Sequence, residues 1–171
     1  MSTSEIHPAA IKIDKLIHKI EEGDIKIPAF QRGFVWKQDQ VIELLDSILH
    51  DYPIGSILLW NSTEKLLATR NVGGFLLPNR DPQYPVNYVL DGQQRLSTIY
   101  AVFCKDRTQS PDNQEYNLET SIFDIYYDFD TEEFVHESSL DKTHKNIRLN
   151  SLFNLNDFMD QAKKLPSNYV D

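Results

Sequence analysis

The stretch Tyr88-Val-Leu-Asp-Gly-Gln-Gln-Arg-Leu-Ser-Thr-Ile-Tyr100 predicts a strand that runs through a tight turn, residues 91–95, into a helix. At such a junction the first helical N–H groups lack intrahelical acceptors, Gly92 lets a ligand approach the backbone, and Arg95 adds a planar fork of donors. This arrangement is typical of a phosphate site. Asp91, at the end of its strand, is placed to hold a divalent ion or a water against the same phosphates.

A purely structural turn would use the same residue types, with Asp91 capping the helix and Arg95 paired with a nearby acid. Gln93 and Gln94 are neutral donors and acceptors that suit the orientation of a nucleotide or a water. The turn contains no lysine and does not fit the pattern GxxxxGK(S/T), so a Walker-type loop is excluded.

Helical and strand-like patterns surround this junction. Apolar residues repeat at helical spacing in residues 13–20, 38–50 and 96–103, which predicts three amphipathic helices lying on a sheet. Short strands are expected at 25–27, 56–60 and 86–90, the second buried on both faces, and 122–129 is expected to turn back into 134–135 as a hairpin. The interleaving favours a small α/β (α+β) domain with a mixed sheet.

The connections between these elements are expected to be long loops at 61–85 and 105–120. A helix is predicted over 152–165, with Asn156 as its N-cap. We expect one domain over residues 1–171, with a core at about 11–150, while 151–171 forms a C-terminal helix or the start of a further helical region. The acidic residues between 124 and 137 are expected on a solvated hairpin edge.

The composition fits one globular domain: 171 residues, 40% hydrophobic, with 17 basic and 26 acidic side chains and a net charge of −9. No membrane span or signal peptide is apparent, and the single cysteine, Cys104, allows no internal disulfide or multi-cysteine metal site, so we expect a cytoplasmic protein with a buried thiol. The acidic total argues against a protein that coats DNA electrostatically, but it leaves a local basic site open.

A second cluster lies at Ile27-Pro-Ala-Phe-Gln-Arg-Gly-Phe-Val-Trp36. Arg32, set among aromatic rings, suits phosphate binding, while the rings stack on a base. In the structural alternative the rings close the core and Arg32 forms a surface ion pair.

Together with Leu-Leu-Asp-Ser-Ile at 44–48 and Tyr-Pro-Ile-Gly-Ser at 52–56, the two clusters resemble the N-terminal domain of GmrSD-type modification-dependent restriction systems, over about residues 11–104. The resemblance implies a ParB/sulfiredoxin-like fold and a nucleoside-triphosphate-binding and hydrolysing domain of a bacterial anti-phage defence protein. It places the hydrolysis motif on residues 91–95 and puts Gln31 and Arg32 in the same cleft. Members of this family usually continue into a helical region and often into an HNH-type nuclease.

We therefore expect the following sites. The expected catalytic residues are Asp91, Gln93, Gln94 and Arg95; the expected nucleotide-binding residues are Gln31, Arg32, Gly92, Arg95, Ser97 and Thr98; Asp91 is the expected ligand of Mg²⁺. Ser97 and Thr98 contact phosphate or metal from the first helical turn, or else satisfy backbone groups.

Two other functions fit the same residues. One is a non-enzymatic module that binds modified DNA or a partner protein; the other is a ParB-like nuclease that uses Asp91. No HNH-type nuclease is apparent in the chain, because His136 and His144 lie in a polar stretch, expected to be exposed, without a ββα-metal pattern. A nuclease module is therefore expected as a partner, and the oligomeric state stays open.

Overall fold

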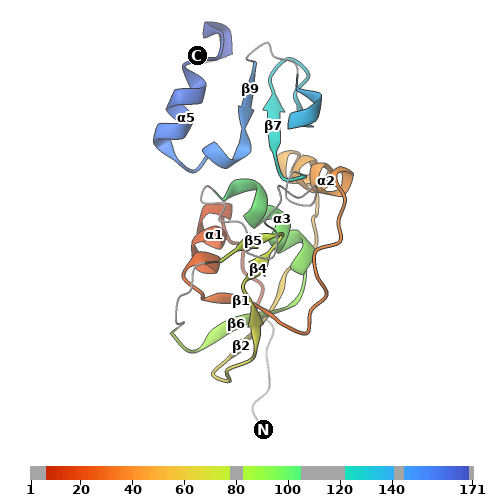
Figure 1. Ribbon diagram of the computed structural model, residues 1–171, viewed down its shortest axis with the longest axis vertical. Helices are drawn as coiled ribbons and strands as arrows, with labels where there is room; N and C mark the ends of the chain where they lie inside the picture. The colour runs from red at the N-terminus through yellow and green to blue at the C-terminus, as the bar shows by residue number, and fades with distance from the viewer. Residues whose placement is uncertain (1–6, 78–82, 105–121, 141–144, 170–171) are drawn as a thin grey trace.

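A mixed four-stranded sheet supports the Asp91 turn. The computed structural model describes residues 7–77, 83–104, 122–140 and 145–169 (Figure 1). The sheet contains β1 (Ile25–Pro28), β2 (Leu58–Ser62), β3 (Ala68–Thr69) and β6 (Val86–Asp91), in the order β2-β6-β1-β3. Strand β6 is parallel to β1 and antiparallel to β2, so the predicted mixed sheet and the α+β class are confirmed.

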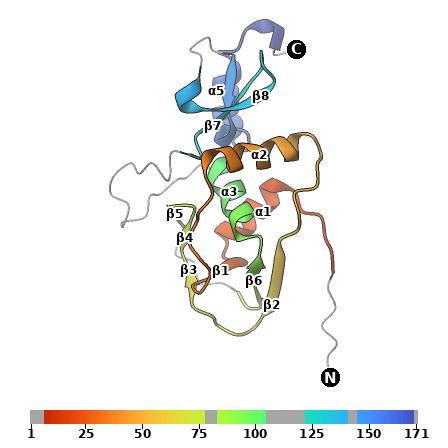
Figure 2. The same ribbon diagram turned by 90° about the vertical axis from the view of Figure 1, so that its right-hand side faces the viewer.

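Three helices accompany the sheet, at the predicted places: α1 (Ile13–Glu21), α2 (Gln38–Leu49) and α3 (Gln93–Phe103). Helices α1 and α2 bury one face each. The prediction that α3 is also amphipathic is wrong, because nine of its 11 residues are buried. The two views show α3 between the sheet and the C-terminal part of the chain, so it is covered on several sides (Figures 1 and 2).

The prediction that the strand near 56–60 is buried on both faces is wrong. Strand β2 lies at the edge of the sheet, and its Leu58, Leu59 and Trp60 are 41%, 36% and 40% exposed. An uncharged run of this length does not distinguish a central strand from an edge strand, because the distinction depends on neighbours that are distant in sequence.

The connection at 61–85 is not only loop. Besides β3 it contains the short hairpin of β4 (Asn71–Val72) and β5 (Phe75–Leu76). The buried Tyr88 holds the first part of this connection in place. Its hydroxyl accepts a hydrogen bond from Leu66 N at 2.9 Å and donates one to Glu64 O at 3.1 Å. The loop predicted at 105–120 lies outside the described residues.

The C-terminal part contains an antiparallel sheet and a helix. Its strands are β7 (Ile125–Asp128), β8 (Glu133–His136) and β9 (Asn146–Arg148), in the order β8-β7-β9, which confirms the predicted hairpin. Single 3₁₀ turns, η1 (Glu137–Ser139), η2 (Leu149–Ser151) and η3 (Ser167–Tyr169), and helix α5 (Leu155–Ala162) complete this part. The predicted N-cap, Asn156, is wrong: the cap is Asn154, whose side chain accepts from Asp157 N at 3.1 Å.

The expected solvated hairpin edge is confirmed for Asp130, Glu132, Glu133 and Glu137, which are exposed, and is wrong for Asp124 and Asp128, which are buried. Asp124 is 2% exposed and pairs with Arg148, while Asp128 accepts hydrogen bonds from two backbone N–H groups of the hairpin turn. The hydrogen bond from Lys145, followed by that from Tyr169, lowers the pKa of Asp130. The hydrogen bonds to Asp128 and the ion pair of Asp130 with Lys145 brace the hairpin turn. His136 is likewise buried, not exposed as predicted.

One hydrophobic core joins the two parts of the fold. Phe123, Ile125 and Leu149 from the C-terminal part belong to the same buried cluster as residues of α1, α2, α3 and β1. Cys104 lies in this cluster with 2% exposure, which confirms the buried thiol. Within the described ranges, every helix is too short or too polar to cross a lipid bilayer.

Candidate functional site

The two clusters singled out in the sequence meet in space. A cleft of about 180 Å³ lies between the loop after β1 and the start of α3. Its lining residues are Gln31, Arg32, Trp36, Asp91, Gly92, Gln93, Gln94 and Arg95. Segments about 60 residues apart in the chain therefore share one concave surface.

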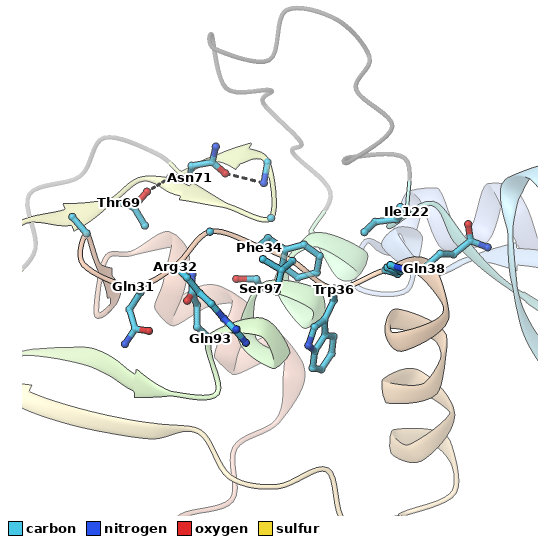
Figure 3. Close-up of a pocket in the computed structure, with 16 residues that line it drawn as sticks. Gln31, Arg32, Phe34, Trp36, Gln38, Thr69, Asn71, Gln93, Ser97 and Ile122 are labelled. Atoms are coloured by element: carbon cyan, nitrogen blue, oxygen red, sulfur yellow. Dashed lines mark hydrogen bonds between the residues drawn. The ribbon is translucent and has the colours of Figure 1, made fainter.

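A larger pocket of about 720 Å³ shares Gln31, Arg32, Trp36 and Gln93 with this cleft (Figure 3). Its other lining residues include Phe34, Lys37, Thr69, Asn71, Ser97 and Ile122. Arg32 and Lys37 are the only charged side chains among the described residues that line it. A chain with a net charge of −9 thus carries a pocket with a positive lining.

The turn into α3 requires glycine. Gly92 is the N-cap residue, has a φ of +85°, and a Cβ there would lie 3.1 Å from the backbone Cα of Ile57. No side chain caps the helix, so the structural alternative in which Asp91 is the cap is wrong. Asp91 is instead 77% exposed at the mouth of the cleft. The helix start therefore keeps the partial positive charge and the outward N–H groups that bind anions.

Arg95 is held beside this turn. Its Nη2 donates to Ser56 O at 2.6 Å and forms an ion pair with Asp91, whose Oδ2 lies 3.6 Å away, so the part of the structural alternative that pairs Arg95 with a nearby acid is confirmed. The guanidinium fits against Gly55 and Gly92, where a Cβ would lie 3.4 and 3.1 Å from its atoms. Its side chain is 24% exposed, and its Nε is buried without a hydrogen-bond partner among the described residues. Arg95 is therefore fixed in direction, with donors still available to a ligand.

Gln94 connects the two segments. Its Nε2 donates to Gly33 O at 3.1 Å, and its Oε1 accepts from Val35 N at 2.8 Å. Because both ends of this amide are engaged and the residue is 8% exposed, Gln94 holds the loop rather than a water. The sequence analysis did not predict this contact. The adjacent pair of glutamines was the only signal of it in the sequence.

The side chain of Gln31 is held by hydrogen bonds, whereas that of Arg32 is not. Gln31 Nε2 lies within hydrogen-bonding distance of Val89 O and Leu90 O, at 3.3 and 3.2 Å, which fixes the side chain to the end of β6. Arg32 is exposed and forms no ion pair with any residue that the structure describes, so this half of the structural alternative is wrong. The other half is confirmed for Phe34 and Trp36, which pack against the core. The loop therefore presents a cation that is available to a ligand.

The remaining predicted residues lie deeper. Gln93 is half-buried and lines both pockets. Ser97 is 1% exposed and lines the larger pocket (Figure 3). Thr98 is fully buried, lines neither pocket, and its hydroxyl has no hydrogen-bond partner among the residues described. The structure thus brings all the predicted residues to the site except Thr98.

We expect Gln94→Leu to destabilise the fold by about 1–3 kcal/mol, because it leaves Gly33 O and Val35 N without their partner. Urea denaturation followed by circular dichroism measures this change. Gln93→Leu is the matched control, because the side chain of Gln93 makes no hydrogen bond to a described residue, and its effect is expected to stay within about 0.5 kcal/mol. Equal midpoints for the two variants would show that Gln94 does not hold the loop.

Fold and site together define a small α+β domain with a positively lined cleft at an uncapped helix start. The chain belongs to the family of GmrSD restriction endonuclease N-terminal domains, which it matches over residues 13–169. The resemblance seen in the sequence is confirmed and extends into the C-terminal part. The chain is thus a module of the restriction and defence proteins.

A curated relative shares part of the sequence. This chain is 38% identical to an uncharacterized protein of Methanocaldococcus jannaschii over 93 residues, which are 52% of this chain. The match spans only 16% of the length of that relative. No solved structure matches the chain.

Proposed function

We propose that this domain binds a nucleoside triphosphate across the two joined pockets and hydrolyses it. The observation that carries the proposal is the convergence of Arg32 and Arg95 on one cleft at the uncapped start of α3. Two guanidinium groups and a helix N-terminus are the donors that phosphate groups prefer.

The sizes of the two pockets agree with such a ligand. The smaller cleft, of about 180 Å³, has the charged donors and suits the phosphates. The larger pocket, of about 720 Å³, has the volume of a typical ligand site and contains Phe34 and Trp36, whose rings suit stacking with a base. The nucleoside therefore lies in the larger pocket, next to the loop that Gln94 holds.

The proposed chemistry assigns a role to each polar residue of the cleft. Arg95 and Arg32 stabilise the charge that builds up on the phosphates as the bond to the leaving group breaks. Gln93, which no described side chain engages, orients the attacking water. Gln94 positions the loop that carries Arg32, so it acts through that loop and not on the reacting atoms.

Asp91 is the residue that would hold Mg²⁺. No group of three or more potential metal ligands exists among the described His, Cys, Asp and Glu side chains. One exposed carboxylate still fits Mg²⁺, which protein sites often bind through one or two carboxylates together with substrate phosphates and water. When bound, the ion would neutralise part of the triphosphate charge.

We expect a triphosphate with Mg²⁺ to raise the melting temperature of the chain, because a ligand at about 100 times its dissociation constant stabilises a protein by roughly 2.7 kcal/mol. Arg32→Ala should weaken this binding about tenfold through the loss of charge-assisted hydrogen bonds, without changing the melting temperature of the free protein. The melting temperatures of the unmodified chain and of Arg32→Ala are measured with each triphosphate, with and without Mg²⁺.

Lys164→Ala is the matched control, because it removes an exposed cation that lines neither pocket. Unchanged nucleotide binding in Arg32→Ala would contradict the proposed site. A duplex DNA arm tests the alternative binding module: affinity for DNA that falls steeply with salt and ignores nucleotide would replace the present proposal. Nicking of that DNA that depends on metal and on Asp91 would indicate the ParB-like nuclease.

The function of the whole protein follows from the family and is also a proposal. In this scheme nucleotide occupancy of the domain controls a linked nuclease module of the HNH type, and the target is modified DNA. The family supports the scheme because its members are the N-terminal domains of restriction endonucleases.

A further inference from the structure

The two pockets join at four residues that offer different hydrogen-bonding groups to a ligand. The residues that line both pockets are Gln31, Arg32, Trp36 and Gln93. A guanidinium and an indole N–H only donate hydrogen bonds, so Arg32 and Trp36 suit ligand atoms that accept, such as phosphate oxygens. A glutamine amide has a donor end and an acceptor end. The direction of each amide therefore decides what can lie beside it.

The contacts of Gln31 settle the direction of its amide. Its Nε2 lies 3.3 Å from Val89 O and 3.2 Å from Leu90 O, two backbone oxygens of β6. The reverse orientation would set Oε1 against two carbonyl oxygens, and none of the three atoms carries a proton. Figure 3 shows the amide nitrogen of Gln31 toward β6 and the amide oxygen on the side of Arg32 and Gln93. The junction of the pockets thus contains an acceptor that is fixed in direction.

This acceptor is available to a ligand. No residue that the structure describes donates to Gln31 Oε1. Gln93 differs, because its side chain makes no hydrogen bond to a described residue, so its amide can present either end. An ionised phosphate oxygen beside Gln31 Oε1 would repel it, since both atoms only accept. The ligand group at this point should therefore carry an O–H or an N–H.

We propose that Gln31 Oε1 accepts a hydrogen bond from a hydroxyl group of the ribose, so that the site prefers ribonucleoside to deoxyribonucleoside triphosphates. The inference rests on the proposed function, in which the smaller cleft holds the phosphates and the larger pocket holds the base. The sugar connects these two parts of a nucleotide and therefore lies at the junction of the pockets. Its hydroxyl groups are the groups of the sugar that can donate to an amide oxygen.

Isothermal titration calorimetry in the presence of Mg²⁺ tests the proposal with ATP, GTP, CTP and UTP, each compared with its 2′-deoxy and 3′-deoxy forms. For the unmodified chain, removal of the hydroxyl that Gln31 contacts should weaken binding about fivefold, the usual effect of one hydrogen bond between neutral groups. The effect stays moderate because Gln31 is only half-buried.

Gln31→Leu removes the acceptor and should bind the ribose and deoxyribose forms with equal affinity. A role of Gln31 in holding the loop alone would weaken all forms by the same factor, so the ratio of affinities separates recognition of the sugar from support of the fold. Gln31→Ala repeats the comparison without a branched side chain at this position, and circular dichroism shows whether each variant is folded.

Gln40→Leu is the matched control. Gln40 Oε1 accepts from Lys37 N at 3.1 Å, so this variant also loses a hydrogen bond between a glutamine side chain and the backbone. Because Gln40 lines neither pocket, the ratio of ribose to deoxyribose affinity should equal that of the unmodified chain.

Equal affinities of the unmodified chain for the ribose form and for both deoxy forms would overturn the proposal and leave the proposed function standing. A preference for ribose that persists in folded Gln31→Leu or Gln31→Ala would also overturn it, because another group would then recognise the sugar. If none of the four triphosphates binds, the proposed function fails, and this inference fails with it.

Discussion

Arg95→Ala is expected to lower the turnover of nucleoside triphosphate by about 10³-fold, the smaller end of the effect of an arginine that stabilises phosphoryl transfer. The expectation follows from the position of the guanidinium, which is fixed by Ser56 O and by the two glycines that flank it. Because the guanidinium is already held in position, it does not have to reorient as charge develops on the phosphates. Release of inorganic phosphate under single-turnover conditions measures the effect.

The control must separate chemistry from folding, because Arg95 also supports the segment before β2. Circular dichroism of Arg95→Ala shows whether its fold is kept. Asp91→Asn is a second test of the site: the side chain is 77% exposed and keeps its shape, so the fold should be unaffected while metal-dependent turnover falls. Arg95→Lys keeps the charge but loses the fork of donors. Relative to the unmodified chain, this variant should lose less affinity for nucleotide than turnover. Full turnover in folded Arg95→Ala or in Asp91→Asn would contradict the assigned roles.

Phe123→Ala is expected to destabilise the chain by about 3–5 kcal/mol, the usual cost of removing a fully buried aromatic ring. Phe123 is 0% exposed and packs against Phe34 and Phe75, with ring centroids 5.0 and 6.0 Å apart. Since Phe34 belongs to the loop that lines the larger pocket, the loss of its partner should also weaken nucleotide binding. Urea denaturation gives the stability, and the shift of melting temperature by nucleotide gives the binding.

Phe153→Ala is the matched control, because the same atoms are removed from a side chain that is 51% exposed. Its cost should stay below about 1 kcal/mol, and nucleotide binding should not change. If both variants lose the same stability, Phe123 is not the link between the C-terminal part and the pocket loop.

The local elements were predictable because their signals lie within short windows. The apolar residues of α1 and α2 repeat at helical spacing, and the hairpin of β7 and β8 has its strand residues on either side of a short turn. Gly92 was placed correctly, because a strand that enters a helix through one residue needs a backbone conformation that glycine adopts freely.

What the sequence did not predict depends on partners that are distant in the chain. The exposure of β2 follows from its place at the sheet edge, and the burial of Asp124 follows from Arg148. The same holds at the site, where the role of Gln94 requires the loop at 33–35, about 60 residues earlier. The residue types indicated the chemistry of the cleft. The different positions of Gln93, which lines the pockets, and Gln94, which holds the loop, could be seen only in the structure.

The contrast between an acidic molecule and its positively lined pocket determines how an anion arrives. The net charge of −9 opposes a triphosphate at a distance, whereas Arg32 and Lys37 attract it at the pocket. Exposed charges act over about 8 Å at physiological ionic strength, so this attraction begins only at the pocket mouth. Encounter with the proposed triphosphate would therefore gain no long-range acceleration from the charge of the protein.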